Sequence, residues 1–513
     1  MFRRLLKRRL PMLAAEGVLA GAIAGVLAML LAAASSPAFA AGPEVISRTQ
    51  HEGRFGGRAV RYTALVERTA IALPSPGPSG QVVSTAYLAD RVDGAAGDPA
   101  RRPVLFLFNG GPIVPSVYLH MMAFGPRRVA VPDDLGADPA GFRLVDNPDT
   151  VLDRADLVFF DPVGTGYSRA TPPSTPRDFF SVDADAQEFV AFARQWAAAH
   201  GREASPKFLF GESYGTVRAA AVARRLATGT PALRLDGVFL FGQGLNIVET
   251  VQRPANLMSY VVSLPTLAAL GWHHGKVRRE GRSFEAFVDE ARRFARDEYL
   301  PALYLGQALP ASRRQALARR LEALTGLPAA RFEALDLRVS KMRYRAELLA
   351  DRGLVLGMYD GRYTAPAAAS GPLPDGSEVL FKAAHAAFAE HAKQSLGLDL
   401  TEPYITDSAV KSFSDWQWGG SAPFDDWPFM AWMREAMEKN PRLRLVLGNG
   451  YADTLTTVGA AEQAVAQAGW PRDRLTQHYY EGGHMAYSIE RSLRALMTDV
   501  RAMLDAADKD PSP

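Results

Sequence analysis

The stretch KFLFGESYGTVRAAAVARRL, residues 207–226, decides the fold. It begins with a short apolar run, which is typical of a strand buried on both faces, and it ends in an alanine-rich segment of helical character. Between them, Gly211, Ser213 and Gly215 have the G-x-S-x-G spacing of a tight strand-to-helix turn, whose flanking positions must be glycine. We therefore expect Ser213 Oγ to be held at the end of a strand, facing the N-terminus of the next helix. A Gly-Ser turn without a chemical role is the alternative.

Apolar runs of the same kind recur on both sides of this turn. Core strands are expected at residues 104–108, 156–160, 207–210, 237–241, 443–447 and 475–480, with helices at 183–200 and 457–467. The earlier segment 54–92 mixes β-branched and polar residues with Gly and Pro, as a strand meander does. This alternation predicts the α/β class, with a doubly wound, mostly parallel sheet that helices cover on both faces.

The alternation stops between residues 245 and 441, where amphipathic helical stretches such as 284–299 and 312–325 dominate. Because strands and helices resume afterwards, we expect this segment to be a helical cap inserted into the core domain. The predicted organisation is a signal peptide (1–40), a first core part (41–244), the cap (245–441), a second core part (442–505) and a disordered tail (506–513).

The first forty residues have the order of a secretory signal peptide. Five basic side chains lie in MFRRLLKRRL, an apolar stretch covers residues 17–34, and SSPAFA at 35–40 offers a small-x-small cleavage site. We expect a periplasmic or secreted protein without stable membrane association; a signal that stays uncleaved would instead leave the protein membrane-anchored. The sequence contains no cysteine, so it has no disulfide, and export without disulfides fits a bacterial periplasm better than a eukaryotic secretory lumen.

Charge and motif spacing exclude several kinds of partner. The formal net charge is only +3, and the arginines are dispersed, so we expect no nucleic acid partner. The turn DPVGTG at 161–166 lacks the Lys-Ser/Thr of a phosphate loop. The pair His273 and His274 has no third ligand at a coherent spacing and is interpreted as a cap-surface or interface pair. We expect neither a metal nor a cofactor.

A serine of ordinary pKa needs a base, and the base needs an acid that orients it. After a turn of this type the acid and the base follow in that order, on loops behind later strands. Asp453 follows one of the late apolar runs, and His484 follows the next one. Of the nine histidines, only His484 has this order and loop context. Rival acids that rank below Asp453 are Glu481, Asp473 and Asp425.

Several motifs in one order give the chain a resemblance to a known family. They are LFNGGP (107–112), DPVGTGYSRA (161–170), LFGESYGT (209–216), SLPTLAALGWHHGK (263–276), DGRYTAP (360–366), NPRLRLVLGNGYAD (440–453) and GGHMAY (482–487). With these motifs the chain resembles the serine carboxypeptidases, and specifically their bacterial exported branch, over most of the mature chain. The resemblance implies an α/β-hydrolase fold with a helical cap and a catalytic triad of Ser213, Asp453 and His484.

The resemblance also implies a binding site around the triad. The backbone N–H groups of Gly111 and Tyr214 would form an oxyanion hole, which stabilises the charge that develops on the attacked carbonyl oxygen. Asn109 and Glu212 would recognise the free C-terminal carboxylate of a peptide, the expected partner. A glutamate that binds a carboxylate must be protonated, so such a site favours acidic pH.

The loop NGGPIVPSVYLH, residues 109–120, departs from the family pattern. The family continues N-G-G-P with a glycine, a small residue and serines, whereas this chain has Ile-Val-Pro at 113–115. If the glycine position needs a positive φ, Ile113 is strained or forces a different backbone path. Leu107 and Ala123 replace a tryptophan and a glutamate of the better known eukaryotic members. We expect this loop to reshape the floor of the pocket and to retune its specificity.

The function predicted from these features is that of an exported serine-type carboxypeptidase, which hydrolyses C-terminal peptide bonds through an acyl-enzyme on Ser213. An esterase or acyltransferase with the same triad is an alternative within this mechanism. An alternative of another class is a catalytically inactive periplasmic binding protein, in which residues 112–115 collapse the oxyanion hole.

Overall fold

The computed structural model describes residues 42–229, 233–408, 410–419 and 426–508. The chain separates into two units after Gly42, and the description below concerns the second unit, which begins at Pro43. The expected signal peptide, residues 1–40, lies outside the described residues. Among the helices that are described, none is long and apolar enough to cross a membrane.

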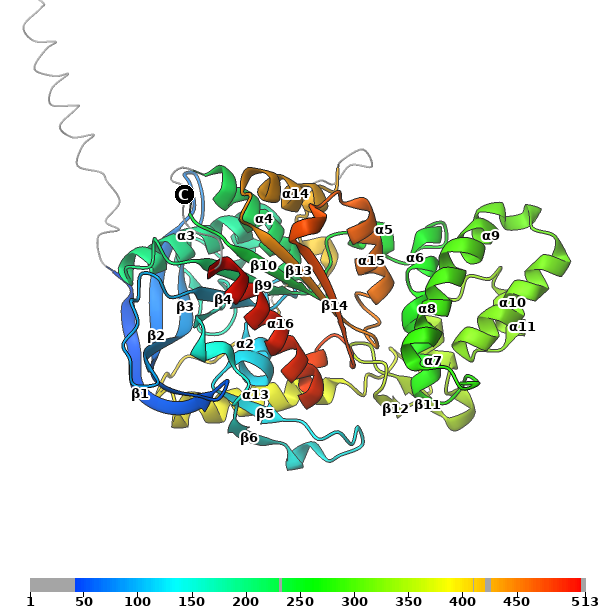
Figure 1. Cartoon of the computed structure of the whole chain (residues 1–513), viewed down its shortest axis with the longest axis horizontal. Helices are drawn as coiled ribbons and strands as arrows, with labels where there is room; N and C mark the ends of the chain where they lie inside the picture. The colour runs from blue at the N-terminus through cyan, green and yellow to red at the C-terminus, as the bar shows by residue number, and fades with distance from the viewer. Residues whose placement is uncertain (1–41, 230–232, 409, 420–425, 509–513) are drawn as a thin grey trace, which may run out of the picture. The chain divides into compact units, whose positions relative to one another are not determined.

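One large sheet organises the second unit (Figure 1). Among the described residues it has ten strands, in the order β1-β2-β3-β7-β4-β9-β10-β13-β14, with the short β8 pairing with β3. The pairings from β1 to β7 are antiparallel, and those from β7 to β14 are parallel. The bounds are β1 Glu44–Phe55, β2 Arg58–Ala72, β3 Ser79–Val92, β4 Val104–Phe108, β7 Asp156–Phe160, β8 Arg169–Ala170, β9 Lys207–Glu212, β10 Gly237–Phe241, β13 Arg444–Gly450 and β14 Leu475–Tyr480.

The central strands are short and wholly apolar because both of their faces are buried. In β4, Leu105 and Leu107 belong to the apolar cluster on one face, and Phe106 and Phe108 belong to the cluster on the other. The Phe106 face is covered by α3 (Val182–Ala199), α4 (Tyr214–Thr228), α14 (Phe429–Lys439) and α15 (Val458–Gln467). The Leu105 face is covered by α2 (Val117–Leu119), α13 (Glu378–Gln394) and α16 (Glu490–Asp508), together with a π-helical turn at His120–Phe124.

This arrangement confirms the α/β-hydrolase fold, because a mostly parallel, doubly covered sheet carries the serine turn between β9 and α4. The expected strands coincide with β4, β7, β10 and β14. Strand β9 continues two residues past the apolar run, to Glu212, and β13 continues to Gly450. Both extensions keep their backbone pairing with neighbouring strands, and such pairing does not depend on apolar side chains.

Residues 245–441, the segment predicted as a cap, leave the sheet between β10 and β13. Their elements are α5 Ile247–Thr250, α6 Leu257–Val261, α7 Leu264–His273, α8 Phe284–Phe294, α9 Leu300–Leu305, α10 Ala311–Thr325, α11 Ala329–Ala334, α12 Lys341–Glu347, β11 Leu354–Leu356, β12 Thr364–Pro366, and then α13 and α14. A third apolar cluster is drawn from residues 257–356 with Ala452 added, so this part of the segment has a core of its own, whereas α13 and α14 pack on the two faces of the sheet.

Three smaller features complete the description. The helix expected at 284–299 is α8 followed by a π-helical turn at Ala295–Tyr299. A separate two-stranded sheet joins β5 (Arg127–Ala130) to β6 (Arg143–Asp146). Helix α16 runs to Asp508, three residues into the segment expected to be a disordered tail, and residues 509–513 lie outside the described part of the chain.

Candidate active site

Ser213 lies between the end of β9 and the start of α4, on a turn whose backbone few residues adopt. Its φ is 59°, in the left-handed region that residues with a side chain rarely occupy. A hydrogen bond of 2.9 Å from the Ser213 amide to the Phe241 carbonyl of β10 holds the turn. A Cβ added to Gly211 would collide with the carbonyl of Gly215, so the turn has no room for a side chain there. The local sequence thereby holds a half-buried serine at the carboxyl end of β9.

Asp453 lies in the loop after β13 and is fully buried. Its Oδ1 accepts hydrogen bonds from the amides of Leu455, at 2.8 Å, and Thr456, at 3.0 Å. Its Oδ2 accepts a hydrogen bond from Thr456 Oγ1 and contacts His484 Nδ1, both at 2.7 Å. These donors fix the carboxylate in an orientation that directs one oxygen at the imidazole.

His484 lies in the loop after β14, where it is almost fully buried. Burial by itself lowers the pKa of the imidazole, but the charge of Asp453, the hydrogen bond to it and the charge of Glu212 outweigh burial, so that the pKa of His484 is raised. Because Nδ1 faces Asp453, Nε2 is the ring nitrogen that points away from the acid.

The end of β10 connects His484 to the serine turn. A Cβ added to Gly242 would lie 3.1 Å from His484 Cε1, and the preceding residue, Phe241, binds the Ser213 amide. The structure therefore brings Ser213, His484 and Asp453 to one edge of the sheet, at the carboxyl ends of β9, β10, β13 and β14. This is the edge at which open α/β sheets bind their ligands.

The rival acids lie apart from this set or outside the described residues. Glu481 is half-exposed and forms an ion pair with Arg491. Asp473 is exposed on a short turn before β14, at the opposite end of that strand from His484. Asp425 is not among the described residues.

The segments that carry the predicted oxyanion donors pack against each other. A Cβ added to Gly110 would lie 2.6 Å from the amide nitrogen of Tyr214, so the chain at 110–111 packs directly against the turn. Gly111 has a φ of 106°, which only glycine adopts without strain. The role of the Gly111 and Tyr214 amides as oxyanion donors stays a prediction.

Ile113 has a left-handed backbone. Its φ is 54°, so of the two outcomes expected from the sequence the structure has the strained one. The side chain is fully buried in the apolar cluster that contains Val163, with its Cγ2 directed toward Gly164. Because the side chain is fully buried, Ile113 exposes no surface of its own to the pocket, and the expected effect of residues 113–115 on specificity stays a prediction.

Glu212 and Asn109 form a buried pair next to Ser213. Asn109 Nδ2 donates to Glu212 Oε2, and the Tyr487 hydroxyl donates to the same oxygen at 2.8 Å. Asn109 Oδ1 accepts the Leu119 amide at 3.1 Å, which fixes the orientation of its side-chain amide. Burial raises the pKa of Glu212 to about 7, and the charge of Asp453 raises it further, against the opposing effects of His484, Tyr487 and Asn109.

Sequence reasoning missed two aromatic residues at this site. Tyr487 stands three residues after His484 within the motif GGHMAY, and this position was the one available signal. Tyr359 lies in the segment predicted as a cap, and its ring is 5.9 Å from the His484 ring between centroids. No spacing in the sequence connects Tyr359 with a histidine that far along the chain.

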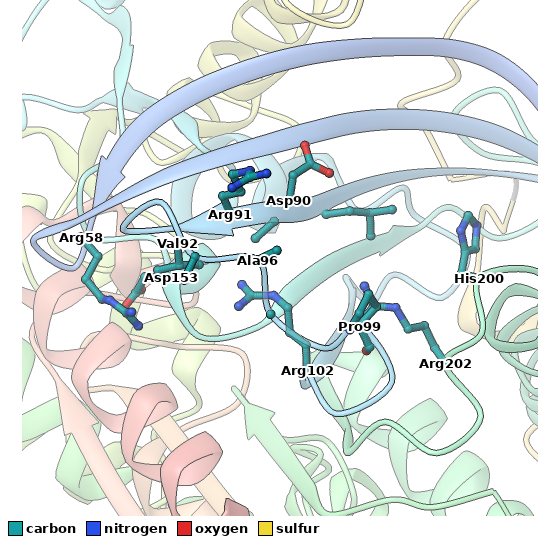
Figure 2. Close-up of a pocket in the computed structure, with 14 residues that line it drawn as sticks. Arg58, Asp90, Arg91, Val92, Ala96, Pro99, Arg102, Asp153, His200 and Arg202 are labelled. Atoms are coloured by element: carbon teal, nitrogen blue, oxygen red, sulfur yellow. The ribbon is translucent and has the colours of Figure 1, made fainter.

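A separate cavity of about 560 Å³ lies at the other ends of the parallel strands, near the residues that precede β4 and β9 (Figure 2). Its arginines all donate to acceptors of the protein: Arg58 to Asp93, Arg91 to the Gly94 carbonyl, and Arg102 and Arg202 to Asp156. These side chains are engaged in structural contacts, so this cavity is not a candidate active site. Within the described part of the chain, no group of His, Asp and Glu is arranged to hold a metal ion.

The pair His273 and His274 has a structural contact of its own. The two rings are in edge contact, 4.8 Å apart between centroids, and His274 Nε2 lies 2.8 Å from the Gly361 carbonyl. Burial lowers the pKa of both imidazoles. His274 is therefore partly buried beside the loop that contains Gly361, whereas His273 is exposed.

Comparison with known proteins bears on part of the chain. Residues 93–270, which include the loop that begins at Asn109 and the serine turn, match the model of the serine carboxypeptidase family. Over these residues the match supports the predicted family and a serine hydrolase, whereas the bacterial exported branch stays a prediction.

Solved structures similar to this chain have low sequence identity to it. The carboxypeptidase Kex1(Δ)p of Saccharomyces cerevisiae, described as prohormone-processing, is 13% identical, with 86% of this chain and 91% of that chain covered and a TM-score of 0.49. A proline iminopeptidase of Mycobacterium smegmatis is 15% identical, with 86% and 100% covered and a TM-score of 0.33. The rice cell wall degrading esterase LipA of Xanthomonas oryzae is 12% identical, with 91% and 97% covered and a TM-score of 0.36. No curated protein matches the chain.

Proposed function

We propose that this protein is an exported serine-type carboxypeptidase that removes C-terminal residues from peptides. The observation that carries the proposal is the buried pair of Glu212 and Asn109 beside Ser213, at the edge where His484 contacts Asp453. The first pair offers a neutral acid and an amide to a carboxylate, and the second offers a general base.

In the proposed reaction Ser213 Oγ attacks the carbonyl carbon of the last peptide bond. His484 Nε2 takes the serine proton, while Asp453 holds the Nδ1–H and stabilises the imidazolium. The amides of Gly111 and Tyr214 stabilise the negative oxygen of the tetrahedral intermediate. His484 then gives its proton to the departing amine, and a water molecule hydrolyses the acyl-enzyme by the same steps in reverse order.

Recognition of the free C-terminus is assigned to Asn109 and Glu212. Below its pKa of about 7, Glu212 is neutral and able to donate a hydrogen bond to a carboxylate that also accepts one from Asn109. Above that pKa the two carboxylates repel each other, so affinity for peptides with a free C-terminus falls as the pH rises.

Export is proposed from the first forty residues and from the absence of cysteine. Their basic, apolar and small-residue segments have the order of a signal peptide, and the absence of cysteine fits a periplasmic location. An uncleaved signal would anchor the protein in the membrane. N-terminal sequencing of the exported protein tests this part of the proposal, because cleavage after Ala40 gives a chain that begins at Ala41.

The proposal is tested with the purified protein, a fluorophosphonate probe, and N-blocked dipeptides in acid, amide and ester form, followed by mass spectrometry. We expect labelling and release of the C-terminal residue in the wild type, and a loss of at least about 10³-fold in Ser213→Ala. Ser283→Ala, which changes an exposed serine that caps α8, is the matched control and should keep full activity.

Other outcomes of these assays would distinguish the alternative functions. Cleavage of esters without cleavage of peptides would assign an esterase or acyltransferase, which uses the same acyl-enzyme with another acceptor. A wild type that reacts with neither probe nor substrate would favour an inactive binding protein and contradict the proposed function.

A further inference from the structure

The loop between β11 and β12, residues 357–363, enters the space between the loops that carry Asp453 and His484. We call it the strap. Its ends are joined by a hydrogen bond of 2.8 Å from the Gly357 amide to the Tyr363 carbonyl, which closes the hairpin. The strap contains most of the motif DGRYTAP, to which the reaction above gives no role.

The strap binds the histidine loop through two backbone donors. The His484 amide donates to the Tyr359 carbonyl at 2.6 Å, and the Gly483 amide donates to Asp360 Oδ2 at 3.0 Å. A Cβ added to Gly483 would collide with the Tyr359 carbonyl and with Asp360 Cα, so residue 483 must be glycine for this close approach. The position of the His484 backbone is thus set by contacts with the strap.

The strap also binds the loop that carries the acid. The Gly361 amide donates to the Ala452 carbonyl at 3.0 Å, and Thr454 Oγ1 donates to the Met358 carbonyl at 2.5 Å. Ala452 and Thr454 are the immediate neighbours of Asp453. A single hairpin loop therefore contacts both loops and fixes their separation, on which the 2.7 Å contact between Asp453 and His484 depends.

Asp360 is the side chain that organises the strap. Its carboxylate is fully buried and is surrounded by donors only. Oδ1 accepts the Arg362 amide and Nε, both at 3.0 Å, and Oδ2 accepts Arg362 Nη2 at 2.5 Å in addition to the Gly483 amide. An asparagine of the same shape would direct its NH₂ group at one of these donor sets, so it cannot replace both oxygens.

We propose that Asp360, held by Arg362, is a positioning residue that sets His484 against Asp453 through the Gly483 amide. The inference rests on the proposed function. It assigns a catalytic purpose to a residue of the predicted cap that is in contact with neither Ser213 nor the expected substrate carboxylate.

The expected effect follows from the geometry of proton transfer. A displacement of a catalytic group by about 1 Å costs up to roughly 10²-fold in rate. We therefore expect Asp360→Asn to lower kcat for an ester substrate by at least about 10-fold, with KM changed less than about 2-fold, since substrate-binding groups are untouched.

The pH profile separates positioning from general destabilisation. His484 is faced by Asp453 and Glu212, and weaker contact with Asp453 leaves its charged form less stabilised. The acid limb of the pH profile is the fall of kcat at low pH, where His484 is protonated. For an ester without a carboxylate, this limb should then move to lower pH by about half a pH unit or more. A variant that is only less stable keeps the acid limb of the wild type, provided that kcat is measured well below its melting temperature.

The test compares the wild type, Asp360→Asn, Arg362→Gln and the control Asp351→Asn in fluorophosphonate labelling rate, ester kcat and KM, pH profile and thermal unfolding. Asp351 is an exposed residue of the same segment, paired with Lys276, and its change should have no effect on the rate. Arg362→Gln keeps the acceptor for Gly483 and should lose about 3-fold in kcat. If Asp360→Asn does not fold, Arg362→Gln alone tests the inference.

Wild-type kcat and an unmoved acid limb in both folded variants would overturn the inference while leaving the proposed function intact. A wild type without labelling at Ser213 would overturn the proposed function, and the inference with it. Slower catalysis with a shifted limb in Asp360→Asn, beside an unaffected Asp351→Asn, supports the positioning role.

Discussion

Glu212 is a carboxyl group buried one residue before a serine and near a second carboxylate, Asp453. Its raised pKa follows from loss of water around the charged form, and Tyr487 and Asn109 donate hydrogen bonds that recover only part of that cost. A buried acid that is neutral at mildly acidic pH suits the recognition of a carboxylate, as the protonated form can donate a hydrogen bond.

Glu212→Gln keeps a neutral donor at every pH. In the wild type we expect KM for a dipeptide with a free C-terminus to rise as the pH increases through about 7, because Glu212 ionises and repels the substrate. In Glu212→Gln this rise should disappear, and KM at pH 8 should be lower than in the wild type. Steady-state kinetics from pH 5 to 8 measure both, with the amidated dipeptide as the control whose KM stays flat. Equal pH dependence for acid and amide substrates would exclude the carboxylate role.

Ile113 combines two opposing contributions to stability. Its side chain is fully buried in the core, which favours isoleucine, but its φ of 54° favours glycine. Loss of the buried side chain costs about 2–5 kcal/mol in the free energy of unfolding, whereas a left-handed residue with a Cβ costs about 1–3 kcal/mol. Burial therefore outweighs strain, which explains how this loop accommodates isoleucine.

Two variants separate these contributions. In the interior of a helix or strand, a protein with glycine is less stable than the same protein with alanine by about 0.5–1 kcal/mol. At residue 113 we expect the order to be reversed, with Ile113→Gly more stable than Ile113→Ala by about 1 kcal/mol and both less stable than the wild type. Urea unfolding measures the difference. If Ile113→Ala were instead more stable than Ile113→Gly, the backbone at residue 113 would not be left-handed in solution.

At the scale of elements, a buried ion pair joins α3 to α4 behind the serine turn. Arg218 of α4 donates three hydrogen bonds to Asp185 of α3, at 2.7 to 3.0 Å, and both side chains are fully buried. Arg218 Nη1 also donates to the Asn109 carbonyl at 3.1 Å, and the Tyr214 hydroxyl donates to Asp185 at 2.9 Å. One ion pair thus connects both helices with the loop that begins at Asn109.

Removing one member of this pair should be far more costly than removing both. We expect Arg218→Met to lower the free energy of unfolding by about 3–5 kcal/mol, since it leaves Asp185 charged and unpaired. The double variant Asp185→Leu/Arg218→Met should recover part of that loss. The exposed pair of Arg225 and Asp183 joins the same two helices, so Arg225→Met is a matched control, with an expected loss below about 1 kcal/mol. Additive losses in the double-mutant cycle would contradict this account.

At the scale of the whole molecule, the buried apolar residues of the described chain form three clusters. One lies on each face of the sheet, and one lies in the segment predicted as a cap. The cluster on the Leu105 face encloses polar groups that join distant parts of the chain. Tyr87 of β3 contacts His120 Nε2 and His391 Nε2, each at 2.7 Å. Burial lowers the pKa of His391 to about 3 and that of His120 well below its ordinary value, so both are neutral in the fold.

These two histidines make stability depend on pH. Their pKa is lower in the fold than in the unfolded chain, so below pH 6.5 the unfolded chain binds more protons. Stability is therefore full above pH 6.5 and is lost as the pH falls toward about 3, with each histidine contributing a slope of at most about 1.4 kcal/mol per pH unit. His391→Gln cannot be protonated, so we expect it to lose less stability between pH 7 and 5 than the wild type. Thermal unfolding across this range measures the slopes, and equal slopes would contradict the assignment.

Local spacing was sufficient to predict much of this fold and to nominate the residues of the candidate site. The glycines around Ser213, the apolar runs of β4, β7, β10 and β14, and the order of Asp453 and His484 are properties of short segments. A tight turn needs glycine wherever it occurs, and a strand buried on both faces needs apolar residues, so both can be inferred from the sequence.

Contacts between distant segments were decided only by the tertiary structure. Nothing near Asp360 in the sequence indicates that its carboxylate accepts the Gly483 amide. Nothing near Ile113 indicates that its side chain is fully buried in the apolar cluster on the Phe106 face of the sheet. The pKa of Glu212 depends on burial and on Asp453, which is more than two hundred residues away in the chain. The sequence by itself determined which groups lie at strand ends, because that is a local property of the backbone. Only the packing of remote loops against one another determined which of these groups are in contact and how far each is buried from water. Burial and contact in turn determine which of the groups are protonated.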